Sequence, residues 1–511
     1  MTYPRHYNAV TDLLDRNITE GRGEKLAFVD PCRSVSYAEL QRNSNRVANL
    51  LTASGVKAET RVAILMHDTV DWPAVFLGAI RAGVVPVAVN TLLGAEPYQY
   101  ILEDARAQIL FVSSPLLPTV EPVLQNLPYL QKVFVDGNAQ GGFDSLQDAM
   151  LEQPDSFDTA RTCCDETAFW LYSSGSTGTP KGVPHIHSSM METARLFGQQ
   201  TLGLQQDDVV FSAAKLFFAY GLGNALSFPM SVGATTILWP GRPTPQDMFD
   251  TLQKHQPSVF CGVPTLYAAM LAHTGGGAKV SCKNLRLCVS AGEALPREVG
   301  EKWKSTFGVD IIDGVGSTEL LHIFLSNQPG DVVYGTSGVA VPGYQLRLVD
   351  ENGKEVAADE IGELLVDGPS STPGYWNQRE KNRATFEGCW TRTGDKYTRT
   401  GDGRYIYCGR TDDMFKVSGQ WLSPFEVESA LVSHSAVLEA AVVGYKDKDD
   451  LTKPRAFVVL QSGADDADLE QILKEHVKNA VGKWKYPRDI QIVETLPKTA
   501  TGKIQRFRLR N

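Results

Sequence analysis

A run of small hydroxyl and glycine residues that leads into a lysine is the part of this sequence best suited to chemistry. Its members are Tyr172, Ser173, Ser174, Gly175, Ser176, Thr177, Gly178, Thr179, Pro180, Lys181 and Gly182. Glycines let backbone N–H groups point inward, hydroxyls add further donors, and Lys181 adds a positive charge, so the run can surround a polyphosphate. It is not a Walker loop, because Lys181 follows Pro180 and precedes Gly182. This difference disfavours a P-loop kinase or ATPase.

Four further motifs follow this loop along the chain. They are Gly314-Val315-Gly316-Ser317-Thr318-Glu319, Thr393-Gly394-Asp395, Gly409-Arg410-Thr411-Asp412-Asp413 and Pro497-Lys498-Thr499-Ala500-Thr501-Gly502-Lys503-Ile504. In this order they resemble the motifs of the adenylate-forming superfamily, which includes acyl- and aryl-CoA synthetases, firefly-type luciferases and the adenylation domains of peptide synthetases. The resemblance covers nearly the whole chain and implies ATP, Mg²⁺ and coenzyme A as reactants and cofactors.

The reaction that this resemblance implies needs charge screening. When a carboxylate attacks the α-phosphorus of ATP, two anions approach each other, so a metal ion and cations must stabilise them. The resemblance assigns Mg²⁺ binding to Glu319 and a phosphate hydrogen bond to Thr318. Asp395 suits the two ribose hydroxyls, because a carboxylate accepts both hydrogen bonds, and Arg410 can donate to the same sugar.

Two short segments resemble the loops that hold adenine in the family. They are Ala291-Gly292-Glu293 and Asp313-Gly314-Val315-Gly316-Ser317. Many relatives have an aromatic residue at the position of Val315. We therefore expect the stacking on the base to be weaker in this chain, or to be supplied by apolar packing.

Lys503 is the residue that the resemblance makes catalytic. A lysine that bridges the carboxylate and the α-phosphate stabilises the negative charge that develops during adenylation. The resemblance also implies a hinge at Asp412, about which a small C-terminal domain rotates after adenylation. Lys416, Ser418 and Gly419 are similar to the stretch that then lines the thiol tunnel.

The acid that is activated depends on a small group of side chains. The resemblance places Ala219, Tyr220, Gly316, His322 and Ile323 around the acyl group. These residue types predict a short, flat, apolar slot with one polar corner, which suits an unsubstituted aromatic ring better than a long acyl chain. Alternatively, His322 is a satisfied core histidine and Tyr220 only packs in the core.

Within the superfamily, the run from Gly314 to Phe324 looks like that of the benzoate–CoA ligase subgroup. This implies that benzoate, ATP and coenzyme A are converted to benzoyl-CoA, AMP and pyrophosphate. Four alternatives stay open: loading of an aryl acid onto a carrier protein, a ligase for a substituted benzoate or another small acid, a non-catalytic ATP-binding module, and luciferase-like oxidation.

The elements around these motifs predict an α/β fold. Apolar strands at 61–66, 84–89 and 109–112 alternate with helical patterns such as Trp72–Ala82, and the alternation resumes at 258–263 and 285–290. Continuous apolar runs are typical of buried parallel strands, so we expect doubly wound, mostly parallel sheets. From about residue 340 to 410, alternating strands and the turn at 351–354 predict a β-rich subdomain.

The last hundred residues predict a separate α+β unit, with a helix that begins after Ser423 and another across Asp468–Val481. We therefore expect a large domain over residues 1–411 and a small mobile domain over 412–511.

The amino-acid composition disfavours several classes of protein. The chain has 511 residues, of which 42% are hydrophobic, and 49 Lys and Arg oppose 59 Asp and Glu for a net charge of −10. A nucleic-acid binder needs clustered cations, so this charge disfavours one. The eight cysteines are too sparse for a disulfide scaffold, and the sequence shows neither a signal peptide nor a run of about 20 apolar residues. We expect a cytoplasmic enzyme without a membrane or nucleic-acid partner, as a monomer or homodimer.

Overall fold

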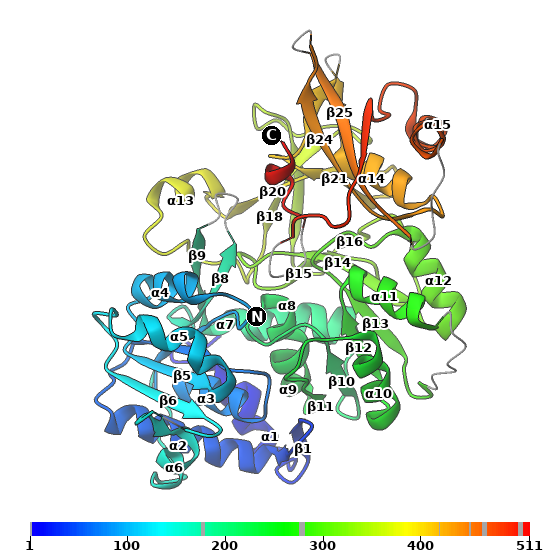
Figure 1. Cartoon of the computed structure of the whole chain (residues 1–511). Coiled ribbons are helices and arrows are strands. Elements are labelled where there is room, and N and C mark those ends of the chain that lie inside the picture. The colour runs from blue at the N-terminus through cyan, green and yellow to red at the C-terminus, as the bar shows by residue number, and fades with distance from the viewer. Residues whose placement is uncertain are drawn as a thin grey trace.

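The computed structural model describes residues 3–139, 141–174, 179–274, 282–417, 420–448, 451–461, 468–498 and 504–510. Two large sheets with helices around them occupy the first two thirds of the chain. A smaller antiparallel sheet follows, and the C-terminal unit lies at the far end of the molecule, beyond that sheet (Figure 1).

The first large sheet has seven strands. In order across the sheet they are β7 (Asp144–Ser145), β6 (Lys132–Asp136), β5 (Ile109–Ser113), β3 (Arg61–Leu65), β4 (Val85–Ala88), β8 (Thr167–Ser174) and β9 (Pro180–Ile186). All neighbours are parallel except β8 and β9. In β3, Val62 and Ile64 belong to one hydrophobic cluster, while Ala63 and Leu65 belong to another on the opposite face. Both faces are therefore covered, as a doubly wound sheet requires.

The helices that cover this sheet divide between its faces. One cluster includes residues of α2 (Tyr37–Ala53), α3 (Asp71–Arg81) and α6 (Leu146–Leu151), and the other includes residues of α4 (Ala95–Asp104) and α5 (Leu117–Leu124). Ser36 begins α2 with a capping box, in which the Glu39 N–H donates to the Ser36 hydroxyl and the Glu39 carboxylate accepts from the Ser36 N–H.

The second large sheet has nine strands. They are β16 (Val339–Ala340), β15 (Ile323–Ser326), β14 (Ile311–Gly316), β13 (Leu287–Ser290), β12 (Val259–Gly262), β10 (Val209–Ser212), β11 (Thr235–Ile237), β1 (Leu26–Val29) and β2 (Ser34–Ser36). The strands from β14 to β1 are parallel, and those at both edges are antiparallel. Helices α10 (Pro245–His255), α11 (Pro264–Thr274) and α12 (Arg297–Phe307) pack on one face. The predicted strands at 258–263 and 285–290 are confirmed, and Pro296 is the residue that precedes α12.

The β-rich subdomain is an antiparallel sheet. Its strands are β17 (Gln345–Val349), β18 (Gly362–Asp367), β19 (Phe386–Glu387), β20 (Trp390–Arg399) and β21 (Tyr405–Arg410). The predicted pairing of the first two is confirmed, since Val349 lies opposite Glu363. Tyr397 and Leu364 join the core cluster that includes the β13 residue Val289, so this subdomain packs directly on the second large sheet.

The C-terminal unit has the predicted α+β composition. The short hairpin of β22 (Phe415–Val417) and β23 (Gln420–Leu422) precedes α14 (Pro424–Val432), β24 (Val437–Lys446), β25 (Thr452–Leu460), α15 (Leu469–Val481) and β26 (Asp489–Ile492). The Glu426 N–H donates to the Ser423 hydroxyl over 3.1 Å, which confirms the cap predicted for α14.

The remaining helices are α1 (Arg16–Thr19), α7 (His187–Thr193), α8 (Ala219–Leu222), α9 (Phe228–Val232), α13 (Arg379–Thr385) and the short segments η1 (Thr11–Asp15), η2 (Ser114–Leu116), η3 (Ala194–Thr201), η4 (Gly223–Ser227) and η5 (Arg506–Leu509). Within the described part of the chain, none of the helices combines the length and apolar character needed to cross a bilayer. The expected domain boundary at 411/412 falls in the turn between β21 and β22.

Candidate functional site

The predicted phosphate loop closes an antiparallel hairpin. Ser173 lies opposite Lys181 in the β8–β9 pair, and Ser174 lies opposite Pro180. Gly175, Ser176, Thr177 and Gly178, and the side chain of Ser174, lie outside the described residues. The Ser173 hydroxyl is buried and has no hydrogen-bond partner in the part of the chain that the structure describes. The hairpin thus brings an unused hydroxyl and a cation to the base of the loop.

Lys181 meets the predicted metal ligand. Its Nζ lies 3.9 Å from Glu319 Oε1, and each side chain is 16% exposed. The Tyr375 hydroxyl donates to the same Oε1 over 2.8 Å, and Lys181 Nζ lies 4.1 Å from the centroid of the Tyr375 ring. Burial lowers the pKa of the Lys181 ammonium, and the charge of Glu319 partly opposes this. Burial, together with the Glu319 charge, raises the pKa of the Tyr375 phenol, so this group stays a donor.

Tyr375 was missed by the sequence reasoning. Its position is fixed by Asn382, whose Oδ1 accepts from the Tyr375 N–H over 2.7 Å and whose Nδ2 donates to the Tyr375 carbonyl over 2.9 Å. The next residue, Trp376, donates its N–H to the Gly182 carbonyl over 3.0 Å, which ties this loop to the phosphate hairpin. The signal in the sequence was the run Gly374-Tyr375-Trp376-Asn377, where two aromatic residues interrupt a loop.

The turn from Gly316 to Glu319 continues from the end of β14. The Ser317 hydroxyl accepts from the Leu320 N–H over 3.3 Å, and the Glu319 carbonyl accepts from the Thr372 N–H over 2.8 Å. Burial lowers the pKa of the His185 imidazole, on the neighbouring strand β9, to about 3, so this ring is neutral.

Asp395 and Arg410 lie directly opposite each other on β20 and β21. Arg410 Nη1 lies 3.0 Å from Asp395 Oδ1 and also donates to the Thr393 carbonyl over 2.9 Å. Although burial acts to lower the pKa of the Arg410 guanidinium, the neighbouring Asp395 carboxylate raises it overall. Gly394 in β20 has φ +72°, a left-handed conformation that favours glycine, and a Cβ there would lie 2.8 Å from Arg410 Nη2. The pair forms a fixed acceptor and donor set suited to a sugar diol.

The residues predicted to hold adenine lie at the ends of two neighbouring parallel strands. Ser290, the last residue of β13, pairs with Asp313 on β14, so Ala291-Gly292-Glu293 lies beside Asp313-Gly314-Val315. Burial raises the pKa of the Asp313 carboxyl to about 7. The carboxyl ends of parallel strands are the usual ligand-binding edge of such sheets.

The predicted acyl-pocket residues gather around His322. Its ring centroid lies 5.7 Å from that of Tyr220, and its carbonyl carbon and oxygen lie 2.7 and 2.6 Å from where a Cβ on Gly316 would be. Ile323 is buried beside Gly314, and Ala219 packs partly buried at the start of α8. The structure therefore brings the five predicted residues to one region.

The region around His322 is mostly apolar, and its polar groups are held in fixed positions. The Tyr220 hydroxyl lies 3.0 and 2.9 Å from the Gly262 and Val289 carbonyls. Burial lowers the pKa of His322 to about 3, so its ring is neutral. His322 Nε2 lies 3.2 Å from the Tyr220 carbonyl, which can only accept, so Nε2 carries the proton and Nδ1 is the acceptor. Nδ1 is buried without a partner among the described residues.

The predicted catalytic lysine, Lys503, lies outside the described residues, as do Ser418 and Gly419. The ends of its loop are described: Lys498 and Ile504 form an antiparallel bridge, and the Gln505 N–H donates to the Pro497 carbonyl over 2.8 Å. Lys416 is exposed on β22, with Nζ 4.7 Å from the Trp421 ring centroid, and Asp412 lies in the turn after β21.

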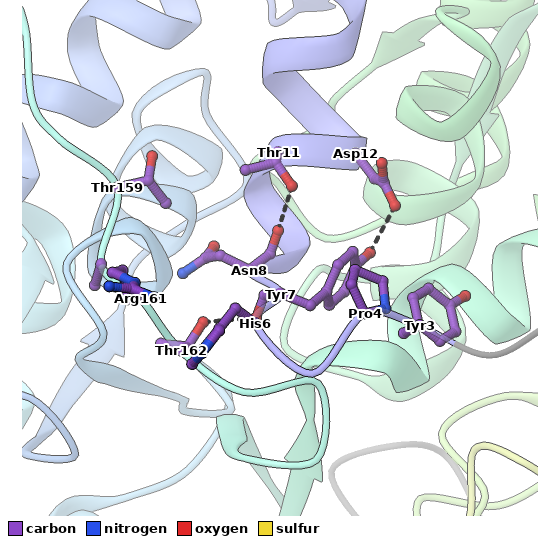
Figure 2. A pocket seen from close by; sticks show the side chains of 11 residues that line it. Tyr3, Pro4, His6, Tyr7, Asn8, Thr11, Asp12, Thr159, Arg161 and Thr162 are labelled. Atoms are coloured by element: carbon purple, nitrogen blue, oxygen red, sulfur yellow. Dashed lines mark hydrogen bonds between the residues drawn. The ribbon is translucent and has the colours of Figure 1, made fainter.

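A separate cavity of about 460 Å³ lies between the N-terminal segment and residues 159–162 (Figure 2). Some of its polar groups are bonded to each other: Tyr7 donates to Asp12 over 2.9 Å, and the Thr11 hydroxyl donates to the Asn8 carbonyl over 2.7 Å. The predicted site residues do not line it, so we do not regard it as the functional site.

Comparison with known proteins agrees with this arrangement. The model of the AMP-binding enzyme family matches residues 14–376, and that of the AMP-binding enzyme C-terminal domain matches residues 426–503. The chain is 56% identical to a 4-hydroxybenzoate–CoA/benzoate–CoA ligase of Rhodopseudomonas palustris, over 99% of this chain and 94% of the relative. It is 54% identical to a benzoate–CoA ligase of Thauera aromatica, over 99% and 96%.

Two solved structures are also similar. An anthranilate CoA ligase, AuaEII, in complex with anthranoyl-AMP has a TM-score of 0.94 at 43% identity, over 99% of this chain and 97% of that one. A benzoate CoA ligase from Burkholderia xenovorans LB400 has a TM-score of 0.91 at 48% identity, over 99% and 100%.

Proposed function

This chain belongs to the family of AMP-binding enzymes, and on that basis we propose that it is an ATP-dependent ligase that joins benzoate to coenzyme A. The products are benzoyl-CoA, AMP and pyrophosphate. The observation that carries the proposal is 56% and 54% identity, over nearly the entire chain, to two ligases named for benzoate.

In the first half-reaction, a benzoate oxygen attacks the α-phosphorus of ATP, and the bond from this phosphorus to the leaving pyrophosphate breaks. Because both reactants are anions, cations at the reacting groups lower the barrier. Lys181, held at the base of the phosphate hairpin, faces the phosphates, and we assign Lys503 to the oxygens between benzoate and the α-phosphate. Asp395 and Arg410 orient the ribose.

Glu319 is the residue that would hold Mg²⁺, and Thr318 would donate a hydrogen bond to the phosphates. Carboxylate oxygens are the ligand type that this ion prefers, and Glu319 is mostly buried beside the phosphate hairpin. When bound, the ion supplies neutralisation of charge on the phosphate oxygens. Tyr375 and Lys181 both contact one oxygen of Glu319 and so fix the orientation of the carboxylate.

In the second half-reaction, the thiol of coenzyme A loses its proton and attacks the carbonyl carbon of benzoyl-AMP, and AMP leaves with the electron pair of the broken C–O bond. We propose that residues 412–511 rotate about Asp412 between the half-reactions. This motion withdraws Lys503 and brings Lys416, Ser418 and Gly419 towards the thiol.

The region around His322 favours a small aromatic acid. The neutral imidazole, the anchored Tyr220 hydroxyl and buried Ile323 present apolar surface without a charge that would recognise a second carboxylate. A second candidate substrate is 4-hydroxybenzoate, because the Rhodopseudomonas relative is named for both acids and His322 Nδ1 is an unused acceptor that a ring hydroxyl would satisfy.

The test is CoA-dependent pyrophosphate release by the purified protein with a panel of acids: benzoate, 4-hydroxybenzoate, anthranilate, cyclohexanecarboxylate and acetate. We expect benzoate to give the highest kcat/KM and benzoyl-CoA to appear in equal amount to AMP. ATP binding without turnover would instead indicate a non-catalytic module. Turnover that needs a carrier protein in place of coenzyme A would also overturn the proposal.

The substitution Gly223→Ala should remodel the acyl region. A Cβ at this position would lie 2.3 Å from His322 Cδ2 and 2.8 Å from Phe228 Cζ, so His322 must move. Overpacking of this kind costs about 1–3 kcal/mol; if that cost falls on benzoate binding, kcat/KM for benzoate drops about 5- to 160-fold. The KM for ATP should stay within about twofold. Gly401→Ala is the matched control, because a Cβ there meets open space. A raised KM for ATP alone would contradict the assignment.

The substitution Tyr375→Phe should weaken use of ATP more than use of benzoate. The phenyl ring still covers Lys181, but the hydrogen bond to Glu319 is lost, and a bond to a charged group contributes about 1.5–3 kcal/mol. We expect about a 10-fold higher KM for ATP in ATP–pyrophosphate exchange, and weaker ATP binding by calorimetry. Tyr375→Leu, which loses both contacts, should be worse. An effect confined to the KM for benzoate would refute this role.

We place the enzyme in the cytoplasm, where ATP and coenzyme A are available. All eight cysteines are unpaired thiols, which agrees with a reducing compartment. We propose a monomer or homodimer, which light scattering on the purified protein would distinguish.

A further inference from the structure

Two arginines just after the lysine loop hold the turn that contains Asp412. Arg510 Nη2 donates to the Asp412 carbonyl over 2.9 Å and to Asp413 Oδ1 over 2.5 Å. Arg506 Nη1 donates to Asp413 Oδ2 over 3.4 Å. Both oxygens of one carboxylate are therefore bound by guanidinium groups, and the peptide between residues 412 and 413 is bound as well. We call Arg506, Arg510, Asp413 and Glu428 the arginine clamp.

The clamp extends into the small domain through Glu428. Arg506 binds this buried carboxylate with two parallel bonds, from Nε over 2.9 Å and from Nη2 over 2.7 Å. Glu428 Oε1 also accepts from the Val442 N–H over 2.7 Å. Paired bonds of this kind fix geometry as well as charge. The clamp thus joins the C-terminal segment, α14, β24 and the 412–413 peptide into one unit.

The residues before Asp412 are held to the large domain instead. The Thr411 N–H donates to the Gly394 carbonyl over 2.8 Å, and the Arg410 side chain is bound to Asp395 and the Thr393 carbonyl. Asp412 lies between these two anchored parts, and its φ and ψ can turn without disturbing either set of contacts.

Several contacts between described residues also cross this point. The N–H groups of Asp413 and Met414 both donate to the Arg410 carbonyl over 3.0 Å. Tyr407 contacts Phe425 with ring centroids 5.2 Å apart, and Lys396 Nζ lies 5.7 Å from the Trp421 ring centroid. These contacts would have to change in a rotation, whereas the arginine clamp would not.

We propose that Arg506, Arg510 and Asp413 are positioning residues that carry the rotation at Asp412 to the loop of Lys503. Arg506 follows Lys503 by three residues. The side chains that hold Asp413 therefore also anchor the chain just after the loop that contains Lys503. The inference rests on the proposed function. It predicts that a weakened arginine clamp slows adenylation, the half-reaction that needs Lys503, and leaves the rate of thioester formation unchanged.

The test uses Arg510→Ala and Asp413→Asn in the full-length enzyme. Adenylation is measured as ATP–pyrophosphate exchange with benzoate, and thioester formation as benzoyl-CoA produced from supplied benzoyl-AMP. We expect each variant to slow adenylation about 10-fold or more, with thioester formation within about twofold of the parent. Arg508→Ala is the matched control, since Arg508 lies on the same turn but is exposed outside the clamp. It should leave both rates unchanged.

Two further variants separate positioning from stability. If Arg510 and Asp413 act through each other, the double variant Asp413→Asn with Arg510→Ala should slow adenylation no more than the worse single variant. Arg510→Lys should restore part of the adenylation rate. Equal losses in both half-reactions, additive losses, or no loss in a folded variant would each overturn the proposal. Absence of ligase activity in the parent enzyme would instead count against the proposed function.

Discussion

Replacing Lys503 with alanine will lower the rate of benzoyl-adenylate formation by about 100- to 1,000-fold. The reason is that the ammonium group acts on charge that develops during attack on the α-phosphorus, and loss of one such donor typically costs about 10²–10³ in rate. Formation of benzoyl-CoA from supplied benzoyl-AMP should stay close to that of the parent, because the lysine has no role there. Pyrophosphate release and thioester formation, followed separately, measure the two effects.

Lys498→Ala is a suitable control for this substitution. Lys498 lies at the other end of the same loop, where its Nζ pairs with Glu439 over 2.5 Å. It should change adenylation only slightly, because a partly exposed pair contributes about 1 kcal/mol or less. A Lys503→Ala enzyme that forms adenylate at the normal rate would remove the assignment of this residue.

Replacing Glu319 with glutamine should have the second largest effect, about a 100-fold loss of adenylation. The amide keeps the size of the side chain but removes the charge that pairs with Lys181 and that would hold Mg²⁺. Raising the Mg²⁺ concentration should restore part of the rate, whereas raising benzoate should not. A Mg²⁺ titration of ATP–pyrophosphate exchange, with Mg²⁺–ATP binding followed by calorimetry, measures this.

Glu298→Gln is the control for Glu319→Gln, because it also removes one carboxylate. Glu298 is exposed on the first turn of α12, away from Glu319 and Lys181. It should leave the Mg²⁺ dependence unchanged. If Glu319→Gln shifted only the KM for benzoate, Glu319 would belong to the acid pocket and not to the phosphates.

Most of the fold could be predicted from local patterns. The apolar runs at 61–66 and 109–112 form strands within one residue of the expected bounds, because buried parallel strands leave continuous apolar stretches in the sequence. Ser423 begins a helix, since its hydroxyl satisfies an N–H that the helix leaves free. The hairpin of β8 and β9 was not predicted, because the run Pro180–Ile186 is interrupted by glycine and two prolines.

The site was predictable only where a motif marked it. Lys181 and Glu319 were expected at the phosphates, and the structure places them 3.9 Å apart. Tyr375 and Arg510 were not found in the sequence, because their roles depend on partners 56 and 97 residues away. Contacts of this kind follow from how the sheets pack, and no spacing rule within one strand or helix reveals them.

The contacts across Asp412 also bear on how easily the proposed rotation takes place. Among the described residues they include two amide hydrogen bonds, one ring contact and one cation–ring contact, and each contributes about 1 kcal/mol. Breaking these four contacts would therefore cost on the order of a few kcal/mol, which contacts made in the other orientation would offset. A ligand needs only a modest difference in affinity to reverse such an equilibrium. In the proposed cycle, departure of pyrophosphate and arrival of coenzyme A would supply that difference without a separate energy source.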